Sequence, residues 1–239
     1  MHKNIVISQP MFLPWIGIFE QLNLCDIFVH YDDVQFPQGR SFINRVQIKT
    51  KDGIKWLTVP IDRKNSAKNI NETLISYTED WRDHHLSIIK HAFSKAKFKN
   101  DVMQIALFIY NQKFNTLSEL NIMTFEYIAN YFGIKKEFLL SSKLNILGTS
   151  SKRLLDIITK LDGNSYITGL GALKYIDYSI FELNNVKLQY MKYNCNKYNQ
   201  LYDNFTPYVS ILDLIANEGK DGVNYMNSKS IYWKEFINE

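Results

Sequence analysis

The sequence predicts an α/β protein with a Rossmann-like, parallel-rich sheet, to which a β-hairpin and a helical insertion are added. Three observations support this prediction. Short apolar runs alternate with segments of helical spacing, as expected for buried strands joined by helices. An Asp-Gly turn between two further runs indicates the hairpin. Amphipathic segments at about residues 79–133 separate two stretches of strand–helix alternation and predict the insertion.

The first strand, helix and strand lie in the N-terminal part of the chain. Residues 4–8 are an apolar run typical of a short buried strand, and residues 27–31 are a second one. Residues 16–24, between them, carry apolar side chains at helical spacing. Together the three segments have the length that a parallel crossover requires. We therefore expect the two strands to lie parallel in one sheet.

Polar side chains follow both predicted strands at the point where each strand ends. Gln9 comes after the first strand, and Asp32 and Asp33 come after the second. In parallel sheets, ligands bind beyond the carboxyl ends of the strands. A carboxylate in this position can hold Mg²⁺ or act as a general base toward an amine. We assign Asp33, with Asp32 second, as the base or metal ligand, and Gln9 as a group that orients the substrate.

The loop that follows Asp33 is rich in side chains that bind anions. Arg40 and Arg45 each carry a rigid fork of donors that matches a phosphate or a carboxylate, while Gln35 and Asn44 add amides. We assign the arginines as anion clamps and the amides as substrate-binding groups. From composition alone, solvated positions on an edge strand explain the two arginines better than anion binding does. A motif shared with known proteins, given at the end of this subsection, favours anion binding instead.

The β-hairpin is predicted next, from residues 46–51 and 54–61, because an Asp-Gly turn joins the two runs. Trp56, Leu57 and Val59 are expected to pack it against the sheet.

Helices predicted at 79–97, 101–112 and 117–132 form the insertion. The first of them places Trp81 and His85 on one apolar face. A histidine in such a position is usually a hydrogen-bonded core residue, and the alternative is a catalytic role. The helix lacks the His-x-x-x-His spacing of a metal-binding pair.

Strand–helix alternation resumes after the insertion. The predicted strands are 136–140, 165–168 and 186–191, the last of which is expected to be the final strand. A helix is predicted at 149–160. Lys152 and Arg153 in its first turn oppose the helix dipole, which is explained either by a bound anion or by solvated charges.

The strand at 165–168 runs directly into a Gly-Leu-Gly turn. Glycines between a strand and a helix allow backbone amides to approach a phosphate, so we assign Gly169 and Gly171, with Tyr175 after them, to substrate binding. The turn lacks the third glycine of a dinucleotide fingerprint and the lysine of a P-loop, and a plain tight turn explains it equally well. The tyrosine-rich residues 193–208 are expected to cover the same region, where their rings either stack on a base or sugar or pack into the core.

The composition is that of a globular protein. The 239 residues, 46% of them hydrophobic and 22% charged, can bury one substantial core, so a single domain covering 1–239 is predicted. The net charge of +4 suits an anionic small molecule and not a nucleic acid, which requires clustered basic residues.

Cys25 and Cys195 follow no metal-ligand spacing and are expected to be reduced thiols. Neither a secretory signal nor a membrane-spanning run is recognised, so a cytoplasmic location is predicted.

Two motifs resemble the opening of the WbqC-like family, a bacterial family met in O-antigen and other polysaccharide gene clusters. The first is SQPMFLPWIGIFEQLNLCDIFVHYDDVQF, and the second is RSFINRVQIKT. Looser matches follow at residues 81–85, 166–175 and 205–217, so the resemblance spans most of the chain. The chain departs from the family pattern at Phe12 and Ile18, where the family tends to have tyrosine.

The resemblance implies an enzyme of bacterial surface-polysaccharide biosynthesis, the O-antigen of lipopolysaccharide being the typical product. The role suggested for that family is a transferase reaction that attaches an amino acid, glycine in particular, or a related acyl group to an amino sugar. The shared motifs support Pro10 and Trp15 as substrate-binding residues, together with Asn44 and Arg45. The match to the family's Trp-x-x-x-His pattern raises the weight of a catalytic role for His85.

Two alternatives remain open. Gln-Pro at the end of the first strand is also loosely similar to nucleotide-binding folds that form adenylates, which would make the protein an ATP-dependent ligase that activates the acyl donor. The other alternative is a non-catalytic scaffold or a protein that only binds sugar nucleotides. The cofactor is left open between Mg²⁺ with ATP and a sugar nucleotide, and the expected partner is a small molecule, either a sugar nucleotide or an activated amino acid.

Overall fold

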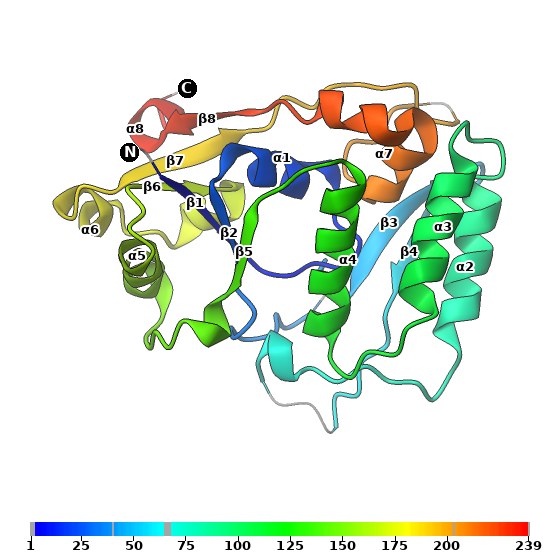
Figure 1. Ribbon diagram of the computed structural model, residues 1–239, viewed down its shortest axis with the longest axis horizontal. Coiled ribbons are helices and arrows are strands. Elements are labelled where there is room, and N and C mark those ends of the chain that lie inside the picture. Colours follow the sequence, from blue (N-terminus) through cyan, green and yellow to red (C-terminus); the bar gives the residue numbers. More distant parts are fainter. Residues whose placement is uncertain (1–2, 40, 65–67, 203, 239) are drawn as a thin grey trace.

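The computed structural model describes residues 3–39, 41–64, 68–202 and 204–238. It contains a six-stranded, mostly parallel sheet and a separate two-stranded hairpin (Figure 1). The strands are β1 (Asn4–Ser8), β2 (Ile27–His30), β3 (Arg45–Thr50), β4 (Gly53–Thr58), β5 (Glu137–Leu140), β6 (Ser165–Thr168), β7 (Lys187–Lys192) and β8 (Lys229–Tyr232). The α-helices are α1 (Ile16–Leu24), α2 (Trp81–Ala92), α3 (Lys99–Tyr110), α4 (Leu117–Tyr131), α5 (Ser150–Lys160), α6 (Tyr178–Leu183), α7 (Ile211–Glu218) and α8 (Trp233–Phe236). The 3-10 helices are η1 (Ile70–Glu72), η2 (Ser141–Lys143), η3 (Leu170–Lys174) and η4 (Gly219–Tyr225).

Strand β1 lies inside the large sheet, with a parallel partner on each side. The strand order is β5-β2-β1-β6-β7-β8, and β1 pairs in parallel with both β2 and β6. The chain winds from β1 outward to β2 and β5, and then returns to β6 on the other side of β1. Such a reversal opens a crevice beyond the carboxyl ends of the two strands where it occurs, here β1 and β6. The predicted Rossmann-like, parallel-rich sheet is confirmed.

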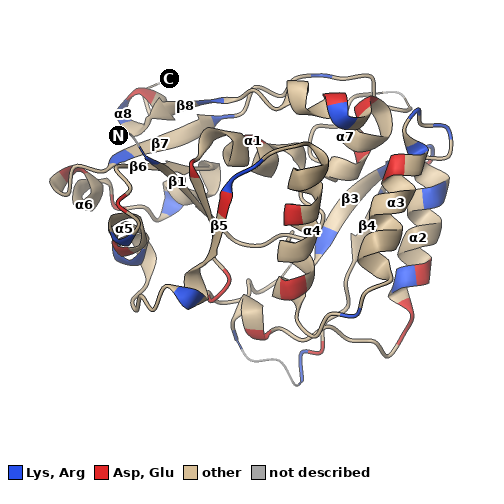
Figure 2. Ribbon diagram, in the orientation of Figure 1, with Lys and Arg blue, Asp and Glu red and all other residues tan. Residues whose placement is uncertain are grey.

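The side chains of β1 alternate between two hydrophobic cores. Val6 belongs to the core formed with α1, α4 and α7, while Ile5 and Ile7 belong to the core formed with α5. Because successive residues of a strand point to opposite faces, a strand covered on both faces must be apolar throughout. Strands β1, β2 and β6 accordingly contain no charged residue (Figure 2).

The predicted hairpin forms, but as a sheet of its own. Strands β3 and β4 pair antiparallel and share no pairing with the six-stranded sheet. Leu57 and Val59 are buried, as expected. The expectation that Trp56 also packs inward was wrong, because side chains alternate along β4 and Trp56 is 39% exposed.

Helices α2, α3 and α4 lie between β4 and β5 in the sequence, where the insertion is predicted. In space, α2 and α3 pack beside the hairpin and α7, in the right-hand part of Figure 1. Their apolar side chains belong to the same core as those of α1. The hydrophobic core therefore continues from one face of the sheet into the helical region.

The C-terminal residues add a strand that the sequence analysis missed. Strand β7 is not the last, since β8 pairs with it in antiparallel orientation and forms the edge of the sheet. Strand β8 contains four residues, none of them buried, so it lacks the apolar run by which the other strands are recognised. Trp233 and Phe236 follow it and pack against the core on the α5 face.

We predict that Gly163→Ala destabilises the fold. An added Cβ would lie 2.5 Å from Ile5 Cγ1 and 3.2 Å from the Ile158 carbonyl oxygen. Because β1 or α5 must shift to accept it, we expect a loss of about 1–3 kcal/mol in the free energy of unfolding, measured by urea denaturation. Gly171→Ala is the matched control, since an added Cβ there meets no atom within 4 Å, and its effect should stay within about 0.5 kcal/mol. Equal effects of the two substitutions would contradict this packing.

Candidate functional site

A cavity of about 750 Å³ opens at the carboxyl ends of β1, β6 and β7, where the strand order reverses. We call it the strand-end cavity. The residues that follow these strands form its wall together with α1 and parts of the segment 193–208. The sequence-assigned residues that line it are Gln9, Trp15, Gly169, Gly171 and Tyr175. A cavity of this size and position is typical of a small-molecule site.

One part of the strand-end cavity is aromatic. The Trp15 ring meets Tyr193 edge to face at 4.9 Å between centroids, and Tyr208 at 5.3 Å. Gly17 makes room for the indole, because an added Cβ would lie 2.2 Å from a ring carbon of Trp15. A backbone bridge between Trp15 and Ser210 joins the tyrosine-rich segment to the start of α1. We call Trp15, Tyr193 and Tyr208 the aromatic wall.

Another part of the lining is polar. Gln9 follows β1, Thr168 is the last residue of β6, and the glycine turn follows it. The Gln21 side chain lies against this turn, since a Cβ added at Gly169 would be 2.9 Å from Gln21 Nε2. Among the described residues of the lining, Lys192 carries the only charge and no carboxylate is present. Its polar groups therefore suit a neutral or anionic ligand better than a coordinated Mg²⁺, which prefers carboxylate oxygens.

Tyr31 connects the strand-end cavity to an ion pair behind its wall. The guanidinium carbon of Arg153 lies 5.1 Å from the centre of the Tyr31 ring. Arg153 Nη2 donates to Asp33 Oδ2 at 2.5 Å, and Arg153 Nε donates to the Ile146 carbonyl at 3.1 Å. Burial raises the pKa of the Tyr31 phenol, so its hydroxyl is neutral at physiological pH. The ion pair with Asp33 also accounts for the positive charge of Arg153 in the first turn of α5. No bound anion is needed to explain that charge.

Asp32 and Asp33, assigned from the sequence as base or metal ligand, have hydrogen-bonding partners behind the cavity wall. The Ser141 hydroxyl lies between them, 3.0 Å from Asp32 Oδ1 and 2.6 Å from Asp33 Oδ1. The Ser142 hydroxyl donates to Asp32 Oδ2 at 2.7 Å, and its backbone N–H donates to Asp32 Oδ1 at 3.0 Å. Neither aspartate lines the strand-end cavity. Their contacts join the end of β2 to η2 and α5.

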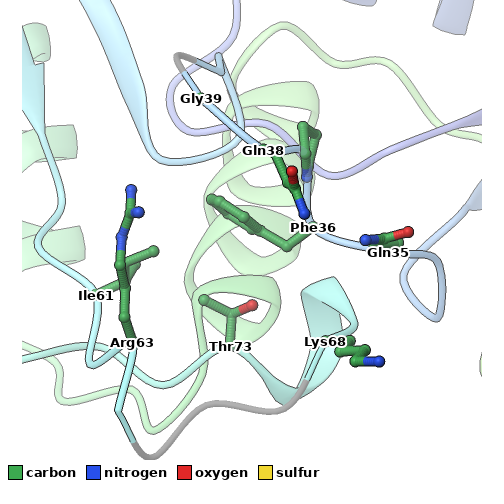
Figure 3. A pocket seen from close by; sticks show the side chains of 9 residues that line it. Gln35, Phe36, Gln38, Gly39, Ile61, Arg63, Lys68 and Thr73 are labelled. Atoms are coloured by element: carbon green, nitrogen blue, oxygen red, sulfur yellow. The ribbon is translucent and has the colours of Figure 1, made fainter.

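Gln35 lies at a second, smaller cavity. This loop cavity, of about 450 Å³, is bounded by residues 35–39 and by Ile61, Arg63 and Thr73 (Figure 3). Its lining shares no described residue with that of the strand-end cavity. Arg40, the neighbouring anion clamp expected from the sequence, lies outside the described residues.

Asn44 and Arg45 make contacts within the hairpin and line neither cavity. Asn44 Nδ2 donates to the Val59 carbonyl at 3.1 Å. The guanidinium carbon of Arg45 lies 4.1 Å from the centre of the Trp56 ring, a cation–π contact.

His85 lies in the hydrophobic core and is 2% exposed. Its Nδ1 is 3.2 Å from the Tyr110 hydroxyl oxygen, and its ring packs against Trp81 at 5.1 Å between centroids. Burial lowers the pKa of His85 to about 4, so the imidazole is neutral at physiological pH. It lines neither cavity. Of the two interpretations drawn from the sequence, this placement agrees with the core histidine.

Two polar residues that shape the site were missed by the sequence analysis. Asn121, which is fully buried on α4, donates through Nδ2 to the carbonyls of Pro10 and Ile43 at 3.1 and 2.8 Å. Pro10 thus contributes a carbonyl that fixes the turn beside Gln9, and its ring does not line the strand-end cavity. Gln21 on α1 was the other omission. The available signal was a polar amide one turn away from large apolar residues, Leu117 and Phe125 for Asn121, and Ile18 and Leu24 for Gln21.

Both cysteines are free thiols. Cys25 is buried, which raises its pKa to about 12. Among the described residues, no group of three or more His, Cys, Asp or Glu side chains converges in a way that could hold a metal ion. None of the described helices is both long and apolar enough to cross a membrane.

Comparison with known proteins relates most of the chain to one family. The sequence profile of the WbqC-like protein family matches residues 9–225, a range that includes every residue assigned to the site. The chain is also 31% identical over 227 residues to the uncharacterised protein Rv1507c of Mycobacterium tuberculosis, and the match covers 94% of this chain and 97% of that protein. No solved structure matches the chain.

We predict that Asp33→Asn lowers stability because it leaves the Arg153 guanidinium without its ionic partner. The Arg153 side chain is 7% exposed and that of Asp33 is 21% exposed. Breaking such a pair from one side should lower the free energy of unfolding by about 2–4 kcal/mol, measured by urea denaturation. The double variant Asp33→Asn/Arg153→Met should recover part of the loss, because no unpaired charge remains. Unchanged stability of Asp33→Asn would instead favour the catalytic assignment of Asp33.

We predict that His85 makes the protein sensitive to acid. Its pKa is lowered to about 4 in the folded state, so between pH 6.5 and 4 the unfolded chain binds a proton that the folded chain does not. This contribution to stability is present above pH 6.5 and is lost as the pH falls, by about 2–3 kcal/mol at pH 4. Denaturation across this range should show a smaller loss in His85→Phe than in the wild type. Substitution of the exposed His91 by glutamine is the control, and an equal effect of both variants would argue against the assignment.

Proposed function

The chain belongs to the WbqC-like protein family, and we propose that it is a cytoplasmic transferase of bacterial surface-polysaccharide biosynthesis. In this proposal the enzyme transfers an amino acid, glycine in particular, or a related acyl group to an amino sugar. The two reactants meet in the strand-end cavity, and at least one of them carries a phosphate.

The observation that carries the proposal is the chemistry of the polar part of the strand-end cavity. A glycine turn lines the cavity at the end of β6, and glycines allow backbone N–H groups to approach a phosphate where a side chain would block them. The Gln9 amide and the Thr168 hydroxyl add neutral hydrogen-bonding groups at the ends of β1 and β6. Hydroxyl-rich sugars are bound by groups of this kind.

For the transfer itself, the protein has to hold the two reactants in the right orientation and to supply polar groups where charge develops. The amino nitrogen of the acceptor attacks the carbonyl carbon of the activated acyl group. The C–N bond forms first and gives a tetrahedral intermediate whose former carbonyl oxygen is an oxyanion. The bond to the leaving group then breaks, and the proton lost by nitrogen passes to that leaving group. The Gln9 amide is our candidate for stabilising the oxyanion of the intermediate, since a fixed N–H donor is most effective where charge develops.

In this proposal Asp32 and Asp33 support the cavity wall and do not act as the base. Asp33 binds Arg153, which lies against the ring of Tyr31, and Tyr31 lines the cavity. Binding of Mg²⁺ with ATP would call for carboxylates beside the phosphates, and the described lining of the strand-end cavity has none. We therefore favour a donor that is activated before it reaches this enzyme.

We predict that the purified protein N-acylates a nucleotide-linked amino sugar when it is offered activated acyl donors. The donor panel contains glycyl and acyl thioesters, with glycine plus ATP and Mg²⁺ as a separate arm, and mass spectrometry of the acceptor detects the product. Gln9→Ala should lower kcat/KM at least about tenfold without a change in Tm. Gln104→Ala, an exposed glutamine on α3, is the matched control.

The arms of this experiment separate the three functions considered. Product with thioester donors supports transfer, while product and pyrophosphate in the ATP arm alone would support the adenylate-forming ligase. An acceptor that binds and is never modified would overturn the proposal in favour of a binding protein.

A further inference from the structure

The aromatic wall of the strand-end cavity has no part in the transfer chemistry described above. Trp15, Tyr193 and Tyr208 all line the cavity, and Tyr208 is 55% exposed. Large aromatic rings that remain exposed at a cavity lose the stabilisation of full burial. A ligand that covers these rings restores the stabilisation that comes from burial. The exposed rings therefore favour a binding role for the aromatic wall.

We propose that the aromatic wall binds the planar base of a nucleotide, so that the reactant held in the strand-end cavity is nucleotide-linked. This inference rests on the proposed function, because it takes the strand-end cavity as the substrate site. The base stacks on the wall, and the sugar and phosphate groups extend toward Gln9 and the glycine turn.

The size and charge of the strand-end cavity are compatible with a nucleotide-linked reactant. Its volume of about 750 Å³ lies within the range of small-molecule sites. The wall is uncharged and suits a neutral flat ring, whereas hydroxyls, amides and backbone N–H groups lie at the ends of β1 and β6. Lys192 directly precedes Tyr193 in the sequence and adds a positive charge to the lining, which suits a phosphate-bearing ligand.

Gly17 is a positioning residue for this wall. A Cβ at residue 17 would lie 2.2, 2.4 and 2.6 Å from three carbons of the Trp15 ring, distances at which the indole must move. The ring in turn contacts both tyrosines, at 4.9 and 5.3 Å between centroids. A methyl group at Gly17 therefore disturbs the whole wall without removing any aromatic residue.

Calorimetric titration of the full-length protein tests the inference with UMP, AMP, ribose 5-phosphate and N-acetylglucosamine 1-phosphate as probes. At least one nucleotide should bind about fivefold or more tightly than ribose 5-phosphate, which lacks the base. Tyr208→Ala and Gly17→Ala should remove this preference, and Tyr208→Phe should keep it because the ring remains. Phe108→Ala is the matched control, since Phe108 is an aromatic residue on α3 that is 41% exposed and lines neither cavity.

Several outcomes would overturn the inference. They are failure of both nucleotides to bind, equal affinity for the base-free probes, or a nucleotide preference that survives in Tyr208→Ala. Should Gly17→Ala not fold, the comparison of Tyr208→Ala with Tyr208→Phe still decides the question. Nucleotide binding without acyl transfer would refute the proposed function and leave this inference intact. Acyl transfer without nucleotide binding would refute this inference and leave the proposed function intact.

Discussion

Burial of β1 on both faces is the constraint on which the rest of the structure depends. Ile5, Val6 and Ile7 are all buried, so a layer of helices must cover the strand on either side. Its backbone is also paired on both edges, with β2 and with β6. Because β1 lies inside the sheet, the chain winds outward from it to β2 and β5 and then returns to β6 on its other side. The crevice at the end of β1 is therefore a consequence of how that strand is buried.

The wall of that crevice is held by polar contacts between segments that are distant in the sequence. Asp33 binds Arg153 across 120 residues, and Ser141 contacts both aspartates at the end of β2. Buried ion pairs add little to net stability, because the loss of hydration offsets much of their attraction. They do penalise arrangements in which a charge is left unpaired. We therefore interpret this network as fixing the position of Tyr31 in the cavity wall.

The fold was largely predictable because its strands and helices have strong local patterns. The expected segments 4–8, 16–24 and 165–168 coincide with β1, α1 and β6. Strand β8 was not predictable in this way, since an exposed edge strand needs no apolar run. The presence of a cavity at the carboxyl ends of the strands was also predictable, because the topology rule for parallel sheets depends only on where the strands end.

The roles of individual polar side chains were much less predictable. A carboxylate after a strand has the same appearance in the sequence whether it faces a cavity or an arginine 120 residues away. Asp33 belongs to the second case. Arg45 likewise resembled an anion clamp, and its partner proved to be Trp56 on the neighbouring strand. Sequence spacing defines the neighbours of a residue along its own helix or strand, whereas these partners come from other elements.

The chain departs from the family pattern at Phe12 and Ile18, and only the second of these residues lines the strand-end cavity. Phe12 is fully buried, 6.0 Å from the His85 ring between centroids. A tyrosine there would place its hydroxyl in the core, where it needs a partner to offset the loss of hydration. Ile18 lines the strand-end cavity beside the aromatic wall. A tyrosine at this position would add another ring and a hydroxyl to the cavity, so Ile18 is the departure that alters the shape and polarity of the lining.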